Sequence, residues 1–445
     1  MSTLYDRAAK GERAVLVQTS KAGDSDAASR LDEFAELATS AGASVVARVF
    51  ARVDAPNARF LLGTGKVEEL HEIRLANEAD LILVNDTLSP VQERNLEKFC
   101  ECRVIGRTGL ILDIFALRAR SHEGKLQVEL AQLKHMATRL VRGWSGLDSQ
   151  RGGAIGLRGP GETKLELDRR YLRGRIQQLQ ERLDKVALQR EQTRRSRQRN
   201  AIPTVSLVGY TNAGKSTLFN RLSGAGVYAA DQLFATLDPT LRRIDGLPCG
   251  PFVLADTVGF IRDLPHDLVA AFQSTLAETR DADLLLHVVD AADPEREQRM
   301  ADVADVLTEI GAAELPQVVV FNKIDRMDGA VPHRDDIDGG RQARVWISAA
   351  QDLGLDLLRE AIVEQLGRER VRTVLQLAPA QGRLRARLYE AGVVQGETPA
   401  DDGGWAIVLD APRARLQALF GLGDGDGGFL RTALAAEFAP VPDAG

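Results

Sequence analysis

The sequence predicts a multidomain α/β protein in which a doubly wound domain is joined to smaller parts, and three observations carry this prediction. With 445 residues, 44% of them hydrophobic, the chain is longer than one hydrophobic core usually supports. Strand-like apolar runs alternate with helical patterns at residues 13–110 and again from residue 203. Between them lie two long helical patterns. We therefore expect an N-terminal α/β domain at 1–110, a basic antiparallel helical hairpin at 111–200, a doubly wound domain at 201–368 and a small α+β domain at 369–445.

The expected hairpin is indicated by two narrow apolar seams with spacings of three and four residues. Their members are Leu126, Leu130, Leu133, Ala137 and Leu140 in the first seam, and Leu165, Leu172, Ile176, Leu179, Leu183 and Val186 in the second. The second helix should end before Pro203, because proline cannot continue it. The connecting segment, residues 143–163, is rich in Gly and Arg, a combination that suits close approach of the backbone to phosphates. We interpret this segment as a functional loop; the alternative is a disordered connection.

Charge is distributed unevenly along the chain. The net charge is -6, yet residues 111–200 alone carry about +10, which leaves about -16 for the remainder. A local basic surface is typical of phosphate contact, and an acidic remainder argues against general DNA binding. The alternative interpretation is a solvated helix face that is rich in arginine.

Cysteine content and hydropathy restrict the compartment. Cys100, Cys102 and Cys249 are too few for a disulfide framework or a four-ligand zinc site. The first residues lack the apolar stretch of a signal peptide, and no run approaches 18 uncharged apolar residues. We expect a cytoplasmic protein without a transmembrane segment, which leaves peripheral membrane association open.

A phosphate-loop signature follows the first strand-like run of the expected doubly wound domain and precedes a helical pattern. In this context, glycines let backbone N–H groups converge on the α- and β-phosphates of a nucleotide. Lys215 would reach the β- and γ-phosphates, and Ser216 would ligate Mg²⁺. The residues expected to line this loop are Gly209, Tyr210, Thr211, Asn212, Ala213, Gly214, Lys215 and Ser216.

Motifs downstream of the loop, in order at strand ends, select a GTPase over an ATPase or kinase. The run FVLADT ends at Asp256, whose carboxylate would hold Mg²⁺ through water, while the Gly259 N–H would face the γ-phosphate. The Asp325 carboxylate can accept from N1–H and the 2-amino group of guanine, which adenine cannot offer together. A backbone N–H of the segment after RVWI would lie near guanine O6. The remaining residues expected at the nucleotide are Thr257, Val258, Asn322, Lys323, Ile324, Ser348, Ala349 and Ala350.

Between these motifs, LFATLDPT is expected to be the switch I segment, with Phe234, Ala235, Thr236, Leu237 and Asp238 near the nucleotide. Thr236 is the chosen Mg²⁺ ligand, and Thr240 is the alternative. The position after Asp-x-x-Gly holds Phe260, which cannot orient water as a glutamine does, so intrinsic hydrolysis should be slow. Asn212 matches the residue that holds a monovalent cation in potassium-activated relatives. K⁺ is therefore a candidate cofactor beside Mg²⁺; the alternative is that Asn212 bonds only its own loop.

With these motifs in place, the chain resembles the HflX family of ribosome-associated GTPases over nearly its whole length. The resemblance also rests on GTGKVEEL (residues 63–70), LSPVQERNLE (88–97), VIGRTGLILDIFALRARSHEGKLQVELAQL and GGAIGLRGPGETKLELDRR (152–170), although Ala154 and Leu157 depart from the usual pattern. It implies GTP-dependent binding to the large (50S) ribosomal subunit and its rRNA. It also implies a role in splitting or rescuing ribosomes, with assembly as a further option.

Two other functions and a second site remain alternatives. The chain could be a GTP-switched binding protein acting on a protein or membrane partner, or a GTPase subunit in tRNA modification. GTGKVEEL also resembles half a phosphate loop. We interpret it as a strand-to-helix turn in which Gly63 and Gly65 adopt unusual dihedrals; a second nucleotide site is the minority interpretation.

Overall fold

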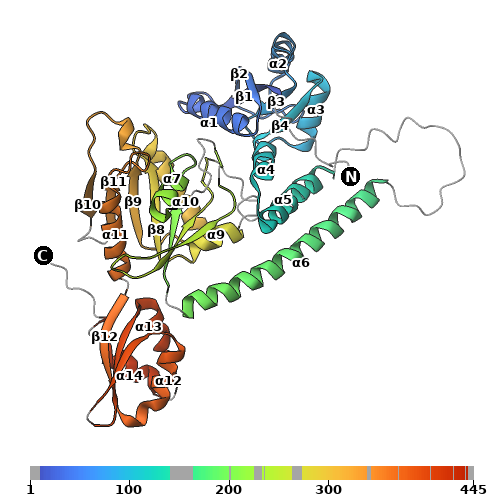
Figure 1. The fold of residues 1–445 in the computed structure, drawn as a ribbon. Helices are drawn as coiled ribbons and strands as arrows, with labels where there is room; N and C mark the ends of the chain where they lie inside the picture. The colour runs from blue at the N-terminus through green and yellow to red at the C-terminus, as the bar shows by residue number, and fades with distance from the viewer. Residues whose placement is uncertain are drawn as a thin grey trace, which may run out of the picture. The chain divides into compact units, whose positions relative to one another are not determined.

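The computed structural model describes residues 11–140, 164–199, 202–224, 233–234, 236–262, 273–337, 342–368, 370–400, 402–423, 425–435 and 437–438 (Figure 1). The predicted loop at 143–163 and switch residue Ala235 lie outside this range.

The N-terminal part is a parallel four-stranded sheet in the order β2-β1-β3-β4. Its strands are β1 (Arg13–Ser20), β2 (Ser44–Arg52), β3 (Leu81–Val84) and β4 (Arg103–Gly106), and its helices are α1 (Ala27–Ser40), α2 (Thr64–Ala76), α3 (Pro90–Cys100) and α4 (Arg107–Arg118). Helix α3 begins where the sequence indicates, because Ser89 and Gln92 form a capping box and Pro90 occupies the first turn. The predicted parallel α/β domain is confirmed.

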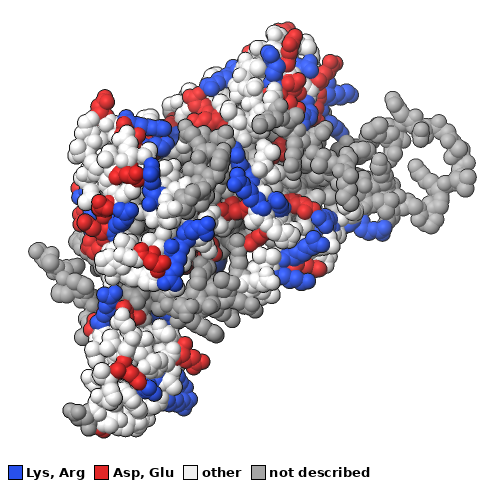
Figure 2. All heavy atoms as spheres, viewed as in Figure 1, with Lys and Arg blue, Asp and Glu red and all other residues white. Residues whose placement is uncertain are grey.

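The hairpin consists of α5 (His122–Leu140) and α6 (Lys164–Arg199) (Figure 1). Leu126, Leu130 and Leu133 of α5 share a buried cluster with Leu172 and Leu179 of α6. Arg175 Nη2 binds Glu129 Oε1 across the pair at 2.6 Å. These members of the two seams therefore pack together as predicted, and α6 ends four residues before Pro203. The side chains of Leu140 and Leu165 lie outside the described part of the chain. Lys and Arg side chains are visible along the described part of the hairpin (Figure 2). Its exposed basic residues include Arg170, Arg173, Arg182 and Lys185.

The central domain has a seven-stranded sheet in the order β10-β11-β9-β8-β5-β7-β6. The strands are β5 (Thr204–Val208), β6 (Thr240–Ile244), β7 (Phe252–Asp256), β8 (Leu284–Asp290), β9 (Gln317–Asn322), β10 (His333–Ile337) and β11 (Gln342–Trp346). The five inner strands are parallel, whereas the edge strands β6 and β10 pair antiparallel with their neighbours. The helices are α7 (Lys215–Ser223), α9 (Gln273–Arg280), α10 (Arg296–Glu309), α11 (Leu355–Arg368) and the 3₁₀ turn η2 (Ile324–Arg326).

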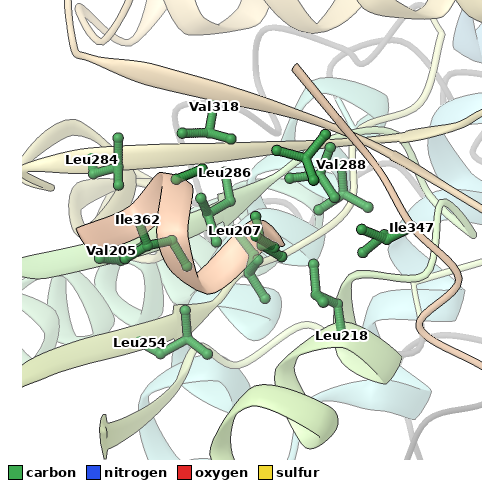
Figure 3. Packing of buried hydrophobic residues seen from close by; sticks show 14 of the residues in the cluster. Val205, Leu207, Leu218, Leu254, Leu284, Leu286, Val288, Val318, Ile347 and Ile362 are labelled. Atoms are coloured by element: carbon green, nitrogen blue, oxygen red, sulfur yellow. The ribbon is translucent and has the colours of Figure 1, made fainter. Parts of the chain in front are cut away.

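The core of this domain is formed by the inner strands together with α7 and α11. Strand residues such as Val205, Leu286 and Val318 pack against Leu218 of α7 and Ile362 of α11 (Figure 3). A second cluster, with Val319 and Phe321, covers the other face of the sheet. Two-sided burial explains why the inner strands read as continuous apolar runs in the sequence.

The C-terminal part has its own core and an antiparallel sheet in the order β12-β14-β13. Its elements are β12 (Arg370–Leu377), η3 (Pro379–Gln381), α12 (Gly382–Glu390), β13 (Val394–Pro399), β14 (Trp405–Pro412), α13 (Arg413–Leu419) and α14 (Asp426–Ala433). The predicted fold class is thereby confirmed. The domain boundaries stay predictions, and α4 runs across the one placed at residue 110. In the part of the chain that is described, no helix is long and apolar enough to cross a membrane.

Candidate nucleotide-binding site

The phosphate loop joins β5 to α7 and requires glycine at two positions. Gly209 has φ of 142°, and a Cβ there would lie 2.2 Å from Val288 O. Gly214 has φ of 95°, and a Cβ there would lie 2.2 Å from Asn322 Nδ2. Both conformations are strained for any residue with a side chain. The signature glycines thus allow the loop to pass close to β8 and β9, so the N-terminus of α7 can face a phosphate.

Lys215, the first residue of α7, folds back over this loop. Its Nζ donates to Gly209 O at 3.0 Å and to Tyr210 O at 2.7 Å. Burial lowers the pKa of Lys215 to about 8; the carboxylate of Asp256 acts in the opposite direction, and the charge of Lys323 lowers the pKa further. The ammonium group is therefore held at the loop that would carry the phosphates.

Ser216 and Asp256, the two residues expected at Mg²⁺, lie together beside the loop. Ser216 Oγ donates to Asp256 Oδ2 at 2.7 Å, and Asp256 is fully buried at the end of β7. The neighbouring Thr257 Oγ1 donates to Leu207 O at 2.6 Å, which fixes the end of β7 against β5. A hydroxyl and a carboxylate are oxygen ligands of the kind Mg²⁺ prefers, so these residues fit the ion. The hydroxyl of Thr211 in the same loop is buried and has no hydrogen-bond partner within the described part of the chain, as expected of a group that meets a ligand.

The two motifs expected to recognise the base, residues 322–325 and 348–350, are hydrogen-bonded to each other, and Asn322 also binds the phosphate loop. Asn322 Nδ2 donates to Ala213 O at 2.9 Å, and Asn322 Oδ1 accepts from Ala349 N at 2.9 Å. Ser348 Oγ donates to Asp325 Oδ1 at 2.5 Å, which orients the carboxylate expected to meet guanine. Asn322 thus connects the phosphate loop to the loop after β11. The engagement of the Ala349 N–H by Asn322 was not foreseen, so the N–H that meets guanine O6 stays a prediction.

Lys323 and Asn212 have backbones in the left-handed region, with φ of 67° and 61°. Lys323 Nζ lies 2.8 Å from Asp290 Oδ2 at the end of β8, which holds its aliphatic stem near the base motif. Asn212 is exposed, and within the described residues its side chain makes no hydrogen bond to its own loop. Asparagine tolerates this conformation better than most residues do.

The described switch I residues contact the N-terminal domain and α5. The Phe234 ring meets Phe115 of α4 edge-on, with centroids 4.7 Å apart. Asp238 accepts from the backbone N–H groups of Arg120 at 2.7 Å and Ser121 at 2.8 Å, so its carboxylate lies at the N-terminus of α5. In the same segment Leu237 is buried and Thr236 is half-buried. The nucleotide contacts expected for these switch I residues stay predictions.

The segment after Asp256 also reaches the N-terminal domain. Arg262 O accepts from Arg107 Nη2 at 2.6 Å. The same guanidinium binds Glu33 Oε1 at 2.6 Å and Asn85 Oδ1 at 2.8 Å, and it is almost completely buried. Phe260 is 1% exposed, which agrees with its inability to orient water. Gly259 lies within the described residues, and its contact with a γ-phosphate stays a prediction.

The motif GTGKVEEL has the structure of an ordinary helix start. Gly63 precedes α2 with φ of -67°, Gly65 lies within α2, and Lys66 pairs with Glu69 at 2.8 Å. The expectation of unusual glycine dihedrals is therefore wrong, because the chain enters α2 through an extended residue rather than a left-handed one. Arg107 lies in the quoted motif VIGRTGL, but its contact with Arg262 O could not be foreseen, because a backbone carbonyl carries no sequence motif.

Comparison with known proteins assigns the chain to known sequence families along most of its length. Residues 28–116 match a family described as GTP-binding GTPase N-terminal, and residues 118–197 match its GTP-binding GTPase Middle Region. Residues 204–323 match a family described as 50S ribosome-binding GTPase. These matches include the phosphate loop, Asp256 and Asn322.

Relatives of similar length are found among bacterial proteins. GTPase HflX of Escherichia coli is 54% identical over 409 residues, covering 92% of this chain and 96% of the relative. GTPase HflX of Magnetococcus marinus is 43% identical, covering 97% of this chain and 98% of the relative. Among solved structures, the complex of SsGBP with GDP is 26% identical with a TM-score of 0.46, covering 80% of this chain and 98% of that one.

Proposed function

The chain belongs to the HflX family of GTPases, and we propose that it binds the large ribosomal subunit in a manner controlled by GTP, within the cytoplasm. The observation that carries this proposal is the match of residues 204–323 to a 50S ribosome-binding GTPase family, beside a basic helical hairpin in the same chain. Contact with rRNA would be made by the exposed cationic face of α6 through phosphates and helix shape.

The chemistry of this GTPase is the attack of water on the γ-phosphorus, which releases GDP and phosphate. We propose that backbone N–H groups of residues 209–214 hold the phosphates and that Lys215 neutralises the β- and γ-phosphate oxygens. Ser216 and Thr236 would ligate Mg²⁺ directly and Asp256 would hold it through water, and the bound ion would supply charge stabilisation. Asn322 and Asp325 would hold the base. Because Phe260 cannot orient water, intrinsic turnover should be slow, and the ribosome would supply further stimulation.

Co-sedimentation tests the ribosomal role. Large subunits are pelleted with the protein in the presence of GDP or a non-hydrolysable GTP analogue, at several salt concentrations. We expect retention with the analogue and a decrease as salt rises, because counterions are released on phosphate contact. Failure to pellet at moderate salt, combined with intact GTP hydrolysis, would instead favour the protein or membrane partner.

A matched pair of double variants locates the contact. Arg173→Glu with Arg182→Glu reverses two exposed charges of α6, whereas Arg359→Glu with Arg431→Glu reverses two charges elsewhere in the chain. We expect the first pair to weaken ribosome binding and reduce its salt dependence, and the second to behave like the parent protein. Equal ribosome binding by the two double variants would contradict the proposal that α6 contacts the ribosome. Dissociation of whole ribosomes, followed by light scattering, distinguishes splitting from binding to free subunits.

We further propose that Asn212 holds a monovalent cation against the phosphates. Its exposed side chain and its position in the phosphate loop support this role. A cation there would offset charge that develops during hydrolysis. Hydrolysis should be faster in KCl than in NaCl at constant ionic strength, and Asn212→Ala should remove the difference. Equal rates in both salts for the parent protein would refute the proposal.

A further inference from the structure

Arg221, near the C-terminal end of α7, reaches the loop that follows β11. Arg221 Nε donates to Ala349 O at 3.2 Å, and Nη2 donates to Ala350 O at 3.1 Å. Arg221 Nη1 lies 3.0 Å from Asp352 Oδ2. One guanidinium group therefore binds three points of a four-residue segment. Such a set of contacts suits the planar fork of arginine, which lysine cannot reproduce.

These contacts determine where the N–H groups of the loop point. A peptide unit is planar, so a bond to Ala349 O also fixes the direction of the Ala350 N–H. The preceding N–H, that of Ala349, is fixed by Asn322 Oδ1 at 2.9 Å. The loop is closed by two backbone hydrogen bonds between Ser348 and Leu353, each 3.0 Å long. Arg221 thus controls the orientation of the peptide units at the tip.

The same helix also carries the phosphate end of the site. Lys215 and Ser216 open α7, and Arg221 follows Lys215 by about 1.7 turns, or about 9 Å along the helix axis. Asn322 connects Ala213 of the phosphate loop to Ala349 of the other loop. The phosphate loop, α7, Arg221, the loop after β11 and Asn322 therefore form a closed ring of contacts.

We propose that Arg221 is a positioning residue for guanine recognition, which holds the carbonyls of Ala349 and Ala350 so that an N–H of this loop is aimed at guanine O6. The inference rests on the proposed assignment of residues 348–350 to the base. Arg221 would act through its contacts with this loop and not through a contact of its own with the nucleotide.

Three diphosphates separate this role from a general structural one. IDP keeps O6 and lacks the 2-amino group, whereas 6-thio-GDP keeps the 2-amino group and N1–H but has sulfur, a poor acceptor, in place of O6. For Arg221→Ala in the full-length protein, we expect the affinity for GDP and for IDP to fall equally, by about 5- to 10-fold. The affinity for 6-thio-GDP should fall about twofold or less, so the preference for GDP over 6-thio-GDP narrows.

Controls make each outcome decisive. Arg221→Lys keeps the charge near Asp352 but not the two carbonyl contacts. It should therefore also reduce the preference for GDP over 6-thio-GDP. Arg359→Ala removes an arginine of α11 that pairs with Asp356 and should leave all three affinities unchanged. An equal loss for all three nucleotides, or no change, would overturn the role of Arg221. Asp325→Asn tests the base site itself. If this variant does not gain affinity for XDP relative to GDP, the assignment of the base site is wrong, independently of the role of Arg221.

Discussion

The lowered pKa of Lys215 predicts how many protons the protein takes up when it binds GDP. Lys215 is buried, its ammonium group donates to Gly209 O and Tyr210 O, and burial lowers its pKa from 10.5 to about 8. At that pKa, the neutral fraction of Lys215 in the free protein is about 10% at pH 7, 50% at pH 8 and 90% at pH 9. Phosphate oxygens favour the charged form, so nucleotide binding should raise the pKa again. The protein should therefore take up a proton on binding GDP.

The sign of the pH dependence follows from this linkage. Below pH 7, Lys215 is charged in both the free and the bound protein, so its contribution to affinity is constant. Above pH 8, binding requires protonation of the free form, so the affinity for GDP should fall by up to about tenfold per pH unit. Uptake should be about 0.1, 0.5 and 0.9 protons at pH 7, 8 and 9.

Calorimetry measures the uptake directly. GDP is titrated into the protein at one pH in two buffers with different ionisation enthalpies, and the difference between the observed enthalpies gives the number of protons. Lys215→Arg keeps a charge that does not titrate, so uptake at pH 9 should be near zero in this variant. Uptake near zero in the parent protein at pH 9 would refute the reasoning, and the same uptake in both proteins would assign the proton to another group.

Three further substitutions test the site and the switch contacts. Gly214→Ala places a Cβ 2.2 Å from Asn322 Nδ2 at φ of 95°, so GDP affinity should fall at least about 100-fold; retained binding in a folded variant would contradict the geometry. Asp325→Asn presents an amide donor to a guanine donor, so XTP should gain relative to GTP in competition assays. Asp238→Ala removes the acceptor for two N–H groups at the start of α5, so hydrogen exchange at residues 120–124 should become faster. Unchanged exchange would show that the contact is not formed in solution.

The phosphate loop was predictable from the sequence, because its geometry depends on residues that are close together in the chain. The glycines at 209 and 214, with Lys215 and Ser216, occur at the spacing of a phosphate loop, and the structure has a strand-loop-helix turn there whose two glycines have positive φ. The contacts of these residues with phosphates and Mg²⁺ stay predictions. The inner strands were also predictable, because burial on both faces produces apolar runs. The edge strands β6 and β10 read TLRRI and HRDDI, and their charged, half-exposed pattern does not indicate a strand.

Contacts between distant segments were not predictable, because nothing local encodes them. Arg107 and Arg221 bind backbone carbonyls 155 and 128 or more residues away, and a carbonyl has no sequence signature. Asp238 was expected near the nucleotide because it lies in the switch I segment. In the structure its carboxylate accepts from two backbone N–H groups at the N-terminus of α5, where the helix dipole favours an anion. Its contact with a nucleotide stays a prediction.

Gly124 shows how such a contact reverses a rule that holds for helices in isolation. Glycine is the third residue of α5, where alanine would ordinarily stabilise a helix by about 1 kcal/mol. A Cβ at this position would lie 2.1 Å from Asp238 Oδ1, and Gly124 N donates to Ser121 Oγ at 2.8 Å. The absence of a side chain therefore lets the switch I carboxylate approach the helix end. Gly124 lowers the intrinsic stability of α5, but it makes room for the Asp238 carboxylate. The sequence of α5 alone therefore suggests a destabilising residue at a position where the structure shows a contact with switch I.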